Sequence, residues 1–239
     1  MTRPLLVALL LAAGCGGSGS AAERPLTVYA AASLTEVFEE LAPEVRFNFA
    51  GSDELATQIR EGAQADVYAA ASPRYPDELL AEGLTEEPVV FATNRLVLIV
   101  PAPNPAGIRT LADLERPGVK LVIGAEGVPI GDYTRTVLED AGRTGALEQV
   151  VSEEQDVKGV VGKVALGEAD AGFVYATDAS AAGSDMRAIE LPLSIQADVR
   201  YPVAVVRGSE RAGEARAFVE LLLGERGRGL LRAAGFGLP

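Results

Sequence analysis

Residues 26–41 read LTVYAAASLTEVFEEL, and this stretch decides the fold class. The first five residues, Leu26–Ala30, have the β-branched and aromatic composition of a strand. Ser33 and Glu36 have the spacing of a capping box at a helix N-terminus. One apolar helix face follows at Leu34, Val37, Phe38 and Leu41. A strand that runs through small residues directly into a helix predicts the first half of a βαβ unit.

The same alternation continues to the end of the chain. Further strands are predicted at residues 45–49, 66–71, 96–100, 121–124, 172–175 and 201–206. Helices are predicted to begin near residues 55, 73, 111, 129 and 157, and two more cover 219–223 and 230–231. Strands that alternate with helices favour parallel βαβ units and sheets covered by helices, which is an α/β fold.

The composition excludes several classes of function. The 239 residues carry 21 Lys and Arg against 34 Asp and Glu, for a net charge of −13. A nucleic-acid partner is therefore not expected, since phosphate binding needs a basic face. There is no His, which excludes Ser-His-Asp and Cys-His catalysis and most zinc sites. The single Cys excludes an intramolecular disulfide.

The N-terminus has the pattern of a secretory address, with residues 1–14 predicted as a signal peptide. Arg3 supplies the positive start, and the apolar run Leu5–Ala13 is too short for a stable membrane anchor. The residues before Cys15 resemble the lipobox of bacterial lipoproteins, although Ala12 stands where Leu is commoner. Residues 15–24 would then be a lipidated Cys and a flexible Gly/Ser linker. We expect a protein outside the cytoplasmic membrane, lipid-anchored or periplasmic, unless Cys15 is simply a buried free thiol.

Four turns combine small residues with a helix start. They lie at residues 29–33, 49–52, 127–131 and 155–157. In an open α/β sheet, ligands lie beyond the carboxyl ends of the strands, where helix N-termini offer free N–H groups to anions. Ser33 and Ser52 would add hydroxyl donors. Serine is also a favoured N-cap, so the spacing alone leaves both roles open.

Several short sequences, in order along the chain, carry a family resemblance. They are VYAAASL at 28–34, ADVY at 65–68, Val157 and Gly159 after Asp156, GFVYATDA at 172–179, YPVAVV at 201–206 and AGF at 234–236. Together they resemble the periplasmic molybdate-binding proteins of ABC transporters, from about Leu26 to Phe236. The resemblance implies a two-lobed α/β fold, each lobe a mainly parallel sheet flanked by helices, with two crossover strands between them. Lobe 1 would comprise residues 25–100 plus 203–239, and lobe 2 residues 101–202.

The resemblance also implies a ligand and the residues that hold it. Ser33 and Ser52 would each give a hydroxyl and a backbone N–H, Ile130 and Val157 a backbone N–H, and Tyr175 its phenol. The ligand would be molybdate or tungstate in the interlobe cleft, delivered to a membrane permease with its ATPase. The chain would be a monomer with no cofactor, no protein ligand to a metal and no catalytic residue.

Two departures from the family pattern bear on the site. Asp53 follows the serine turn Gly51–Ser52, where relatives often have more Ser, and a carboxylate facing the ligand would repel a dianion. Position 130 is Ile rather than a small Ala, which a backbone donor tolerates but which makes the cleft wall bulkier.

Three other functions remain open from the sequence. The same fold could bind sulfate or another small anion. A carboxylate-dependent hydrolase could use acids such as Asp66, Asp156, Asp170 or Asp178, although the chain has no nucleophile motif. A structural or adhesive lipoprotein would bind no small ligand, and ligand-dependent thermal stabilisation would distinguish it from a binding protein.

Overall fold

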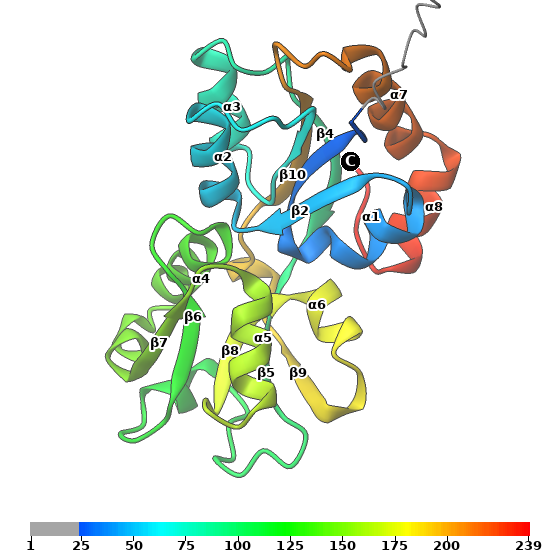
Figure 1. Cartoon of the computed structure of the whole chain (residues 1–239). Coiled ribbons are helices and arrows are strands. Elements are labelled where there is room, and N and C mark those ends of the chain that lie inside the picture. The colour runs from blue at the N-terminus through cyan, green and yellow to red at the C-terminus, as the bar shows by residue number, and fades with distance from the viewer. Residues whose placement is uncertain (1–23) are drawn as a thin grey trace, which may run out of the picture.

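The computed structural model describes residues 24–239, which form two lobes, each built on a five-stranded sheet (Figure 1). The strand order is β2-β1-β3-β10-β4 in the first sheet and β7-β6-β8-β5-β9 in the second. The predicted two-lobed α/β fold is therefore confirmed. The predicted signal peptide, Cys15 and almost all of the linker lie outside the described residues.

Both sheets have the same mixed arrangement. In each, the first three strands are parallel, and the fourth strand runs antiparallel to both of its neighbours. That reversed strand is β10 in the first sheet and β5 in the second. Strand β5 follows β4 of the first sheet and β10 follows β9 of the second sheet through residues 191–198, so β5 and β10 are the two crossover strands that the family resemblance implies.

The elements of the first lobe are mostly those expected. They are β1 (Thr27–Ala31), η1 (Ala32–Leu34), α1 (Thr35–Leu41), β2 (Arg46–Ala50), α2 (Ser52–Arg60), β3 (Val67–Ala69), α3 (Arg74–Ala81), β4 (Val89–Asn94), β10 (Val199–Val205), α7 (Ala212–Leu223) and α8 (Glu225–Ala233). Edge strand β4 was not predicted, although it begins with the short apolar run Val89–Ala92.

The second lobe contains β5 (Leu96–Pro101), η2 (Leu111–Glu115), β6 (Leu121–Gly124), α4 (Pro129–Asp140), η3 (Thr144–Gln149), β7 (Val150–Glu154), α5 (Val157–Ala165), β8 (Ala171–Tyr175), α6 (Ala176–Ala181), η4 (Gly183–Asp185), β9 (Met186–Glu190) and η5 (Leu193–Ile195). The edge strands β7 and β9, which are partly exposed and polar, were not predicted from the sequence. The short helix α6 was not predicted either.

Helices cover both faces of the first sheet. Alternate residues of β3 and the chain after it enter different cores: Val67, Ala69 and Ala71 join one, and Tyr68 and Ala70 the other. Figure 1 shows α1, α7 and α8 on one side of this sheet and α2 and α3 on the other. This two-sided burial explains why Tyr201–Val205 in β10 is a continuous apolar run rather than an alternating pattern.

The structure places the lobe boundaries earlier than expected. Strand β5 lies in the second sheet, so the first crossing is at Arg95 and not after residue 100. Strand β10 begins at Val199 and lies in the first sheet, so the second crossing precedes residue 199 and not 203. A buried strand has the same composition in either sheet, which is why hydrophobicity could not locate the boundary.

Candidate functional site

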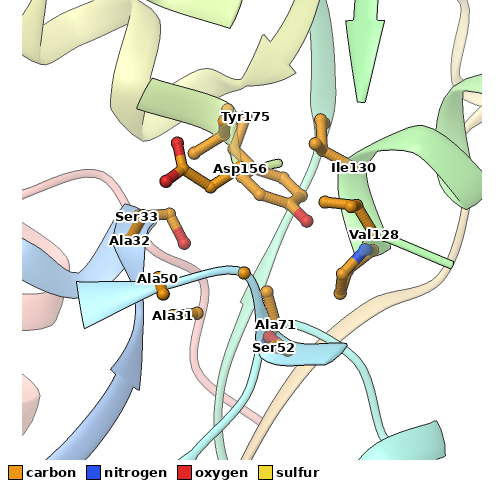
Figure 2. Close-up of a pocket in the computed structure, with 13 residues that line it drawn as sticks. Ala31, Ala32, Ser33, Ala50, Ser52, Ala71, Val128, Ile130, Asp156 and Tyr175 are labelled. Atoms are coloured by element: carbon orange, nitrogen blue, oxygen red, sulfur yellow. Dashed lines mark hydrogen bonds between the residues drawn. The ribbon is translucent and has the colours of Figure 1, made fainter. Parts of the chain in front are cut away.

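A small cavity of about 20 Å³ lies between the lobes and is lined by every residue predicted to bind the ligand. The lining comes from five turns that follow strands and from the last residue of β8: Ala31, Ala32, Ser33, Ala50, Gly51, Ser52, Ala71, Val128, Pro129, Ile130, Asp156, Val157 and Tyr175. Figure 2 shows these residues around one space. Four of these residues are Ala and one is Gly, and such small residues leave backbone atoms accessible to a bound molecule.

Helix N-termini supply backbone donors on the side of the second lobe. Ile130 is the second residue of α4 and Val157 the first residue of α5, and both are buried. N–H groups at these positions have no acceptor within their own helix. Gly131 lets α4 begin this close to β6, because a Cβ there would lie 2.2 Å from the carbonyl oxygen of Ala125. Ile130 presents its backbone at the cavity, and its side chain belongs to the core.

The two serines are not the N-caps that their spacing allowed. Gly51 is the N-cap of α2 and Leu34 that of α1, and neither helix has a side-chain cap. The capping box predicted at Ser33 and Glu36 is therefore wrong. Ser33 Oγ lies 3.0 Å from the Tyr201 hydroxyl, and Ser52 Oγ accepts a 3.1 Å hydrogen bond from the Ala71 N–H. The Ser52 proton therefore remains for the cavity, whereas either hydroxyl can be the donor between Ser33 and Tyr201.

Tyr175 contributes a buried hydroxyl without a hydrogen-bond partner among residues 24–239. Its side chain is fully buried at the end of β8, and burial raises the pKa of its hydroxyl well above the ordinary value. The phenol therefore keeps its proton. In Figure 2 this hydroxyl points into the space bounded by Ser33, Ser52 and Val128. A buried polar group without a partner is costly, so this donor indicates a missing acceptor.

Two acidic residues, Asp156 and Asp53, lie in or next to the turns that line the cavity. Asp156 caps α5, as predicted, by accepting a 2.9 Å hydrogen bond from the Gly159 N–H, and Figure 2 shows its carboxylate directed away from the Tyr175 hydroxyl. Asp53 does not line the cavity. One of its oxygens lies beside Gly51, and burial raises the pKa of its carboxyl. Among the described residues, no Lys or Arg lines the cavity. The donors offered to a ligand are therefore neutral, and Asp156 is the one charged residue among the described residues that line the cavity.

The lobes are closed on each other around this cavity. Arg74 Nη1 of the first lobe lies 3.4 Å from Asp132 Oδ2 of the second, and Lys158 Nζ lies 2.7 Å from Glu36 Oε1. Tyr75 donates a hydrogen bond across the cleft to the Gly127 carbonyl. These contacts surround the opening, so the donors of both lobes face one space only in this closed arrangement.

Two features of the site were missed from the sequence. Ala71 lines the cavity from a fifth turn, and its signal was available, since Ala70, Ala71 and Ser72 also follow a strand and precede a helix. Tyr201 lies behind Ser33, whereas the sequence predicts only a strand and a family sequence at residues 201–206. Nothing local indicates that role, because the two residues are 168 positions apart.

Asp178 is a buried carboxyl whose titration gives a testable pH dependence. Only 1% of its side chain is exposed, and Lys158 Nζ lies 3.3 Å from its Oδ1. Burial raises the pKa of Asp178 to about 6 and outweighs the attraction of Lys158. Between pH 4 and 6 the folded chain thus holds a proton that the unfolded chain has lost, so stability falls as the pH rises through that window.

We therefore expect Asp178→Asn to remove this loss of stability. The difference in unfolding free energy between variant and wild type should be roughly 1–3 kcal/mol more favourable to the variant at pH 7.5 than at pH 4.5. Urea unfolding at the two pH values measures the change. The same substitution at the exposed Asp185 is the control and should leave the difference between the two pH values unchanged. Identical pH dependence in wild type and Asp178→Asn would contradict the expectation.

Comparisons with known proteins agree with this geometry. The family model described as bacterial extracellular solute-binding protein matches residues 26–237. The Mycobacterium tuberculosis protein named molybdate-binding protein ModA is 38% identical over 255 residues, covering 100% of this chain and 97% of the relative.

Two solved structures are similar in fold. The periplasmic molybdate-binding protein of Azotobacter vinelandii has a TM-score of 0.80 at 22% identity, covering 90% of this chain and 99% of that one. The sulfate-binding protein SubI of Mycobacterium tuberculosis has a TM-score of 0.76 at 18% identity, covering 88% of this chain and 85% of that one. The resemblance seen in the sequence is confirmed, and the chain belongs to the family of bacterial extracellular solute-binding proteins.

Proposed function

We propose that this protein captures molybdate in the interlobe cavity and delivers it to the permease of an ABC transporter. The observation that carries the proposal is the buried Tyr175 hydroxyl, which has no partner among the described residues and faces the two serine hydroxyls and the N-termini of α4 and α5. Ser33, Ser52, Ile130, Val157 and Tyr175 are the proposed ligand-binding residues. The 38% identity to a molybdate-binding protein over the whole chain supports the choice of ligand.

The chemistry of the donors fits a fully deprotonated oxyanion. Molybdate carries no proton at neutral pH and can only accept hydrogen bonds. The serines would give two donors each and the other three residues one each, about seven in total. At about 1.5–3 kcal/mol for each charged hydrogen bond, these gross roughly 10–20 kcal/mol before the costs of desolvation and closure. Nanomolar affinity needs about 12 kcal/mol, so tight binding does not require a Lys or Arg in the site.

Protonated and smaller oxyanions should be rejected for different reasons. Hydrogenphosphate carries an O–H that needs an acceptor, and an unpaired buried group lowers affinity strongly. Sulfate is fully deprotonated, so only the size of the cavity can discriminate against it. Tungstate has nearly the size and charge of molybdate, and we propose that it binds as well.

Calorimetric titration of residues 24–239 with molybdate, tungstate, sulfate and phosphate tests the proposal. Submicromolar binding of molybdate and tungstate, with sulfate and phosphate at least about 100-fold weaker, is the expected result. Strong sulfate binding would keep the site and change the transporter. No heat with any of the four anions would refute the proposed function.

The serine hydroxyls give a direct prediction. Ser33→Ala and Ser52→Ala should each weaken molybdate binding by more than about tenfold, since each removes one hydrogen bond to a charged ligand. The folded structure should persist, with a modest loss of stability at Ser52, where the Ala71 N–H loses its acceptor. Titration of each variant measures the effect. Unchanged affinity in both variants would refute the site assignment.

The remaining proposals concern the setting of the protein. Among residues 24–239 no helix is both long enough and apolar enough to cross a membrane. We propose that residues 1–14 are removed, that a lipid on Cys15 holds the chain at the membrane, and that it acts there as a monomer beside a permease and ATPase. The proposed role is binding and delivery, with no catalytic step.

A further inference from the structure

A chain of hydrogen bonds connects the crossover between the lobes to the cavity. Asn94, the last residue of β4, lies directly before the crossing at Arg95. Its Nδ2 is 3.0 Å from Thr177 Oγ1 and 3.5 Å from the Tyr201 hydroxyl. That hydroxyl is in turn 3.0 Å from Ser33 Oγ. Tyr201 is completely buried, so its hydrogen bond with Ser33 is strengthened by the apolar surroundings.

The direction of the Asn94 hydrogen bonds is fixed from the crossover end. The Arg95 N–H donates a 2.9 Å hydrogen bond to Asn94 Oδ1, which identifies the other amide atom as the NH₂ group. An NH₂ group donates and cannot accept. The Tyr201 oxygen therefore accepts from Asn94. Either oxygen can be the donor between Tyr201 and Ser33, and with Asn94 donating, the single Tyr201 proton is available to Ser33 Oγ. Within residues 24–239, Asn94 and Ser33 are the two groups hydrogen-bonded to this hydroxyl.

Tyr201 is held firmly in this arrangement. Its ring packs edge-on against Tyr175 at 5.8 Å and against Phe236 at 5.3 Å between ring centroids. Burial raises the pKa of the Tyr201 hydroxyl well above its ordinary value, so it remains a proton donor. When Tyr201 donates to Ser33 Oγ, the Ser33 proton is not needed for that hydrogen bond. It can then point into the cavity and donate to a ligand.

We propose that Tyr201 and Asn94 are positioning residues that keep the Ser33 hydroxyl a donor toward the ligand, and that they thereby discriminate against protonated oxyanions. The inference rests on the proposed function. A ligand O–H placed at Ser33 would leave the Ser33 proton without an acceptor. Without Tyr201 and Asn94 in this orientation, the hydroxyl can rotate to accept, and a protonated anion is tolerated.

Ser52 provides the internal comparison. Its oxygen accepts from the Ala71 backbone N–H, which no side-chain substitution can remove or reverse. Its donor character is therefore built into the backbone. At Ser33 the same character depends on two side chains, so it is open to test by mutation.

Two substitutions test the direction of the hydrogen bonds that connect Asn94, Tyr201 and Ser33. Tyr201→Phe keeps the ring and removes the proton that Ser33 receives. Asn94→Asp replaces the donor with an acceptor, so that Tyr201 donates to residue 94 and Ser33 donates to Tyr201. Molybdate and phosphate affinities are measured at pH 7.5 by titration and by competition at high phosphate. We expect Tyr201→Phe to lower the molybdate-to-phosphate affinity ratio about tenfold, and Asn94→Asp to lower it further.

The added charge of Asn94→Asp is controlled with sulfate, which is deprotonated like molybdate. Charge repulsion lowers the affinity for all three dianions, whereas reversal of the hydrogen bonds spares phosphate alone. Tyr68→Phe is the matched control for losing a buried phenol. The Tyr68 hydroxyl donates to the Ser52 carbonyl at 2.6 Å and touches neither serine hydroxyl, so the ratio should stay at the wild-type value.

A double-mutant cycle separates positioning from a general structural role. In the Ser33→Ala background, Tyr201→Phe should change molybdate affinity less than about twofold, because its effect passes through the Ser33 hydroxyl. An equal loss in both backgrounds overturns the proposal. The proposal is also overturned if both Tyr201→Phe and Asn94→Asp keep the wild-type molybdate-to-phosphate affinity ratio, or if neither variant binds phosphate detectably. A wild-type chain that binds none of the anions overturns the proposed function and this inference together, whereas tight wild-type binding leaves only the inference at risk.

Discussion

Replacing Gly51 with alanine is expected to weaken molybdate binding on the order of 100-fold while leaving each lobe folded. A Cβ at Gly51 would lie 2.4 Å from the carbonyl oxygen of Gln155, a backbone atom of the opposite lobe. The φ of Gly51 is −59°, which alanine adopts without strain, so an open arrangement of the lobes accepts the new methyl group. The clash arises only on closure.

The physical reason is a population shift. Ligand binding draws donors from both lobes, so it stabilises the closed state, and a variant that resists closure loses affinity by the same free energy. The Cβ would also lie 2.7 Å from Asp53 Oδ1, but this side chain can move aside, whereas the Gln155 backbone is held between β7 and α5.

Titration with molybdate measures the loss, and small-angle scattering with and without molybdate reports closure. The wild type should contract on addition of the ligand, and Gly51→Ala should contract less. Gly213→Ala in α7 is the control in the same lobe, because nothing lies within 4 Å of its added Cβ. Wild-type affinity together with wild-type contraction in Gly51→Ala would show that the lobes do not close on this contact.

Tyr175→Phe is expected to weaken molybdate binding by about 10- to 100-fold, the worth of one hydrogen bond to a charged ligand. The ring and its packing against Tyr201 remain, and only the hydroxyl is removed. Because that hydroxyl has no partner among the described residues, its loss should not lower the stability of the ligand-free protein. Weaker binding without destabilisation is the expected signature of a group that serves the ligand.

Thermal unfolding with and without molybdate distinguishes this signature. Tyr175→Phe should unfold with the wild type in the absence of ligand and gain much less from its addition. Tyr68→Phe should behave differently, since its hydroxyl donates to the Ser52 carbonyl and its loss costs about 1 kcal/mol without any ligand. A Tyr175→Phe variant with wild-type affinity would remove this residue from the site.

Local sequence determined most of the secondary structure and four of the five turns that line the cavity. Small residues between a strand and a helix identified the surroundings of Ser33, Ser52, Ile130 and Val157, because the carboxyl ends of parallel strands share one edge of a sheet. The missed elements were the edge strands β4, β7 and β9 and the short helix α6. Strands β7 and β9 are partly exposed and polar, so their residues carry little of the apolar signal of a buried strand.

The serines show where local reasoning is insufficient. Their spacing fitted an N-cap as well as a ligand, and only the partners of the two hydroxyls decide between the interpretations. Ser33 meets Tyr201 and Ser52 meets Ala71, contacts that join segments 168 and 19 residues apart. The capping prediction was wrong at Ser33 because the chain continues from β1 through a 3₁₀ turn before α1 begins.

By itself, therefore, the sequence determined the α/β class, the exclusion of His- and disulfide-based chemistry, the family resemblance and the residues around the site. The tertiary structure decided which sheet each crossover strand joins, how closely Gly51 approaches Gln155, and which side chains lie behind Ser33. The first group depends on residue type and spacing along the chain. The second depends on contacts between distant segments, which form only when both lobes pack around one cavity.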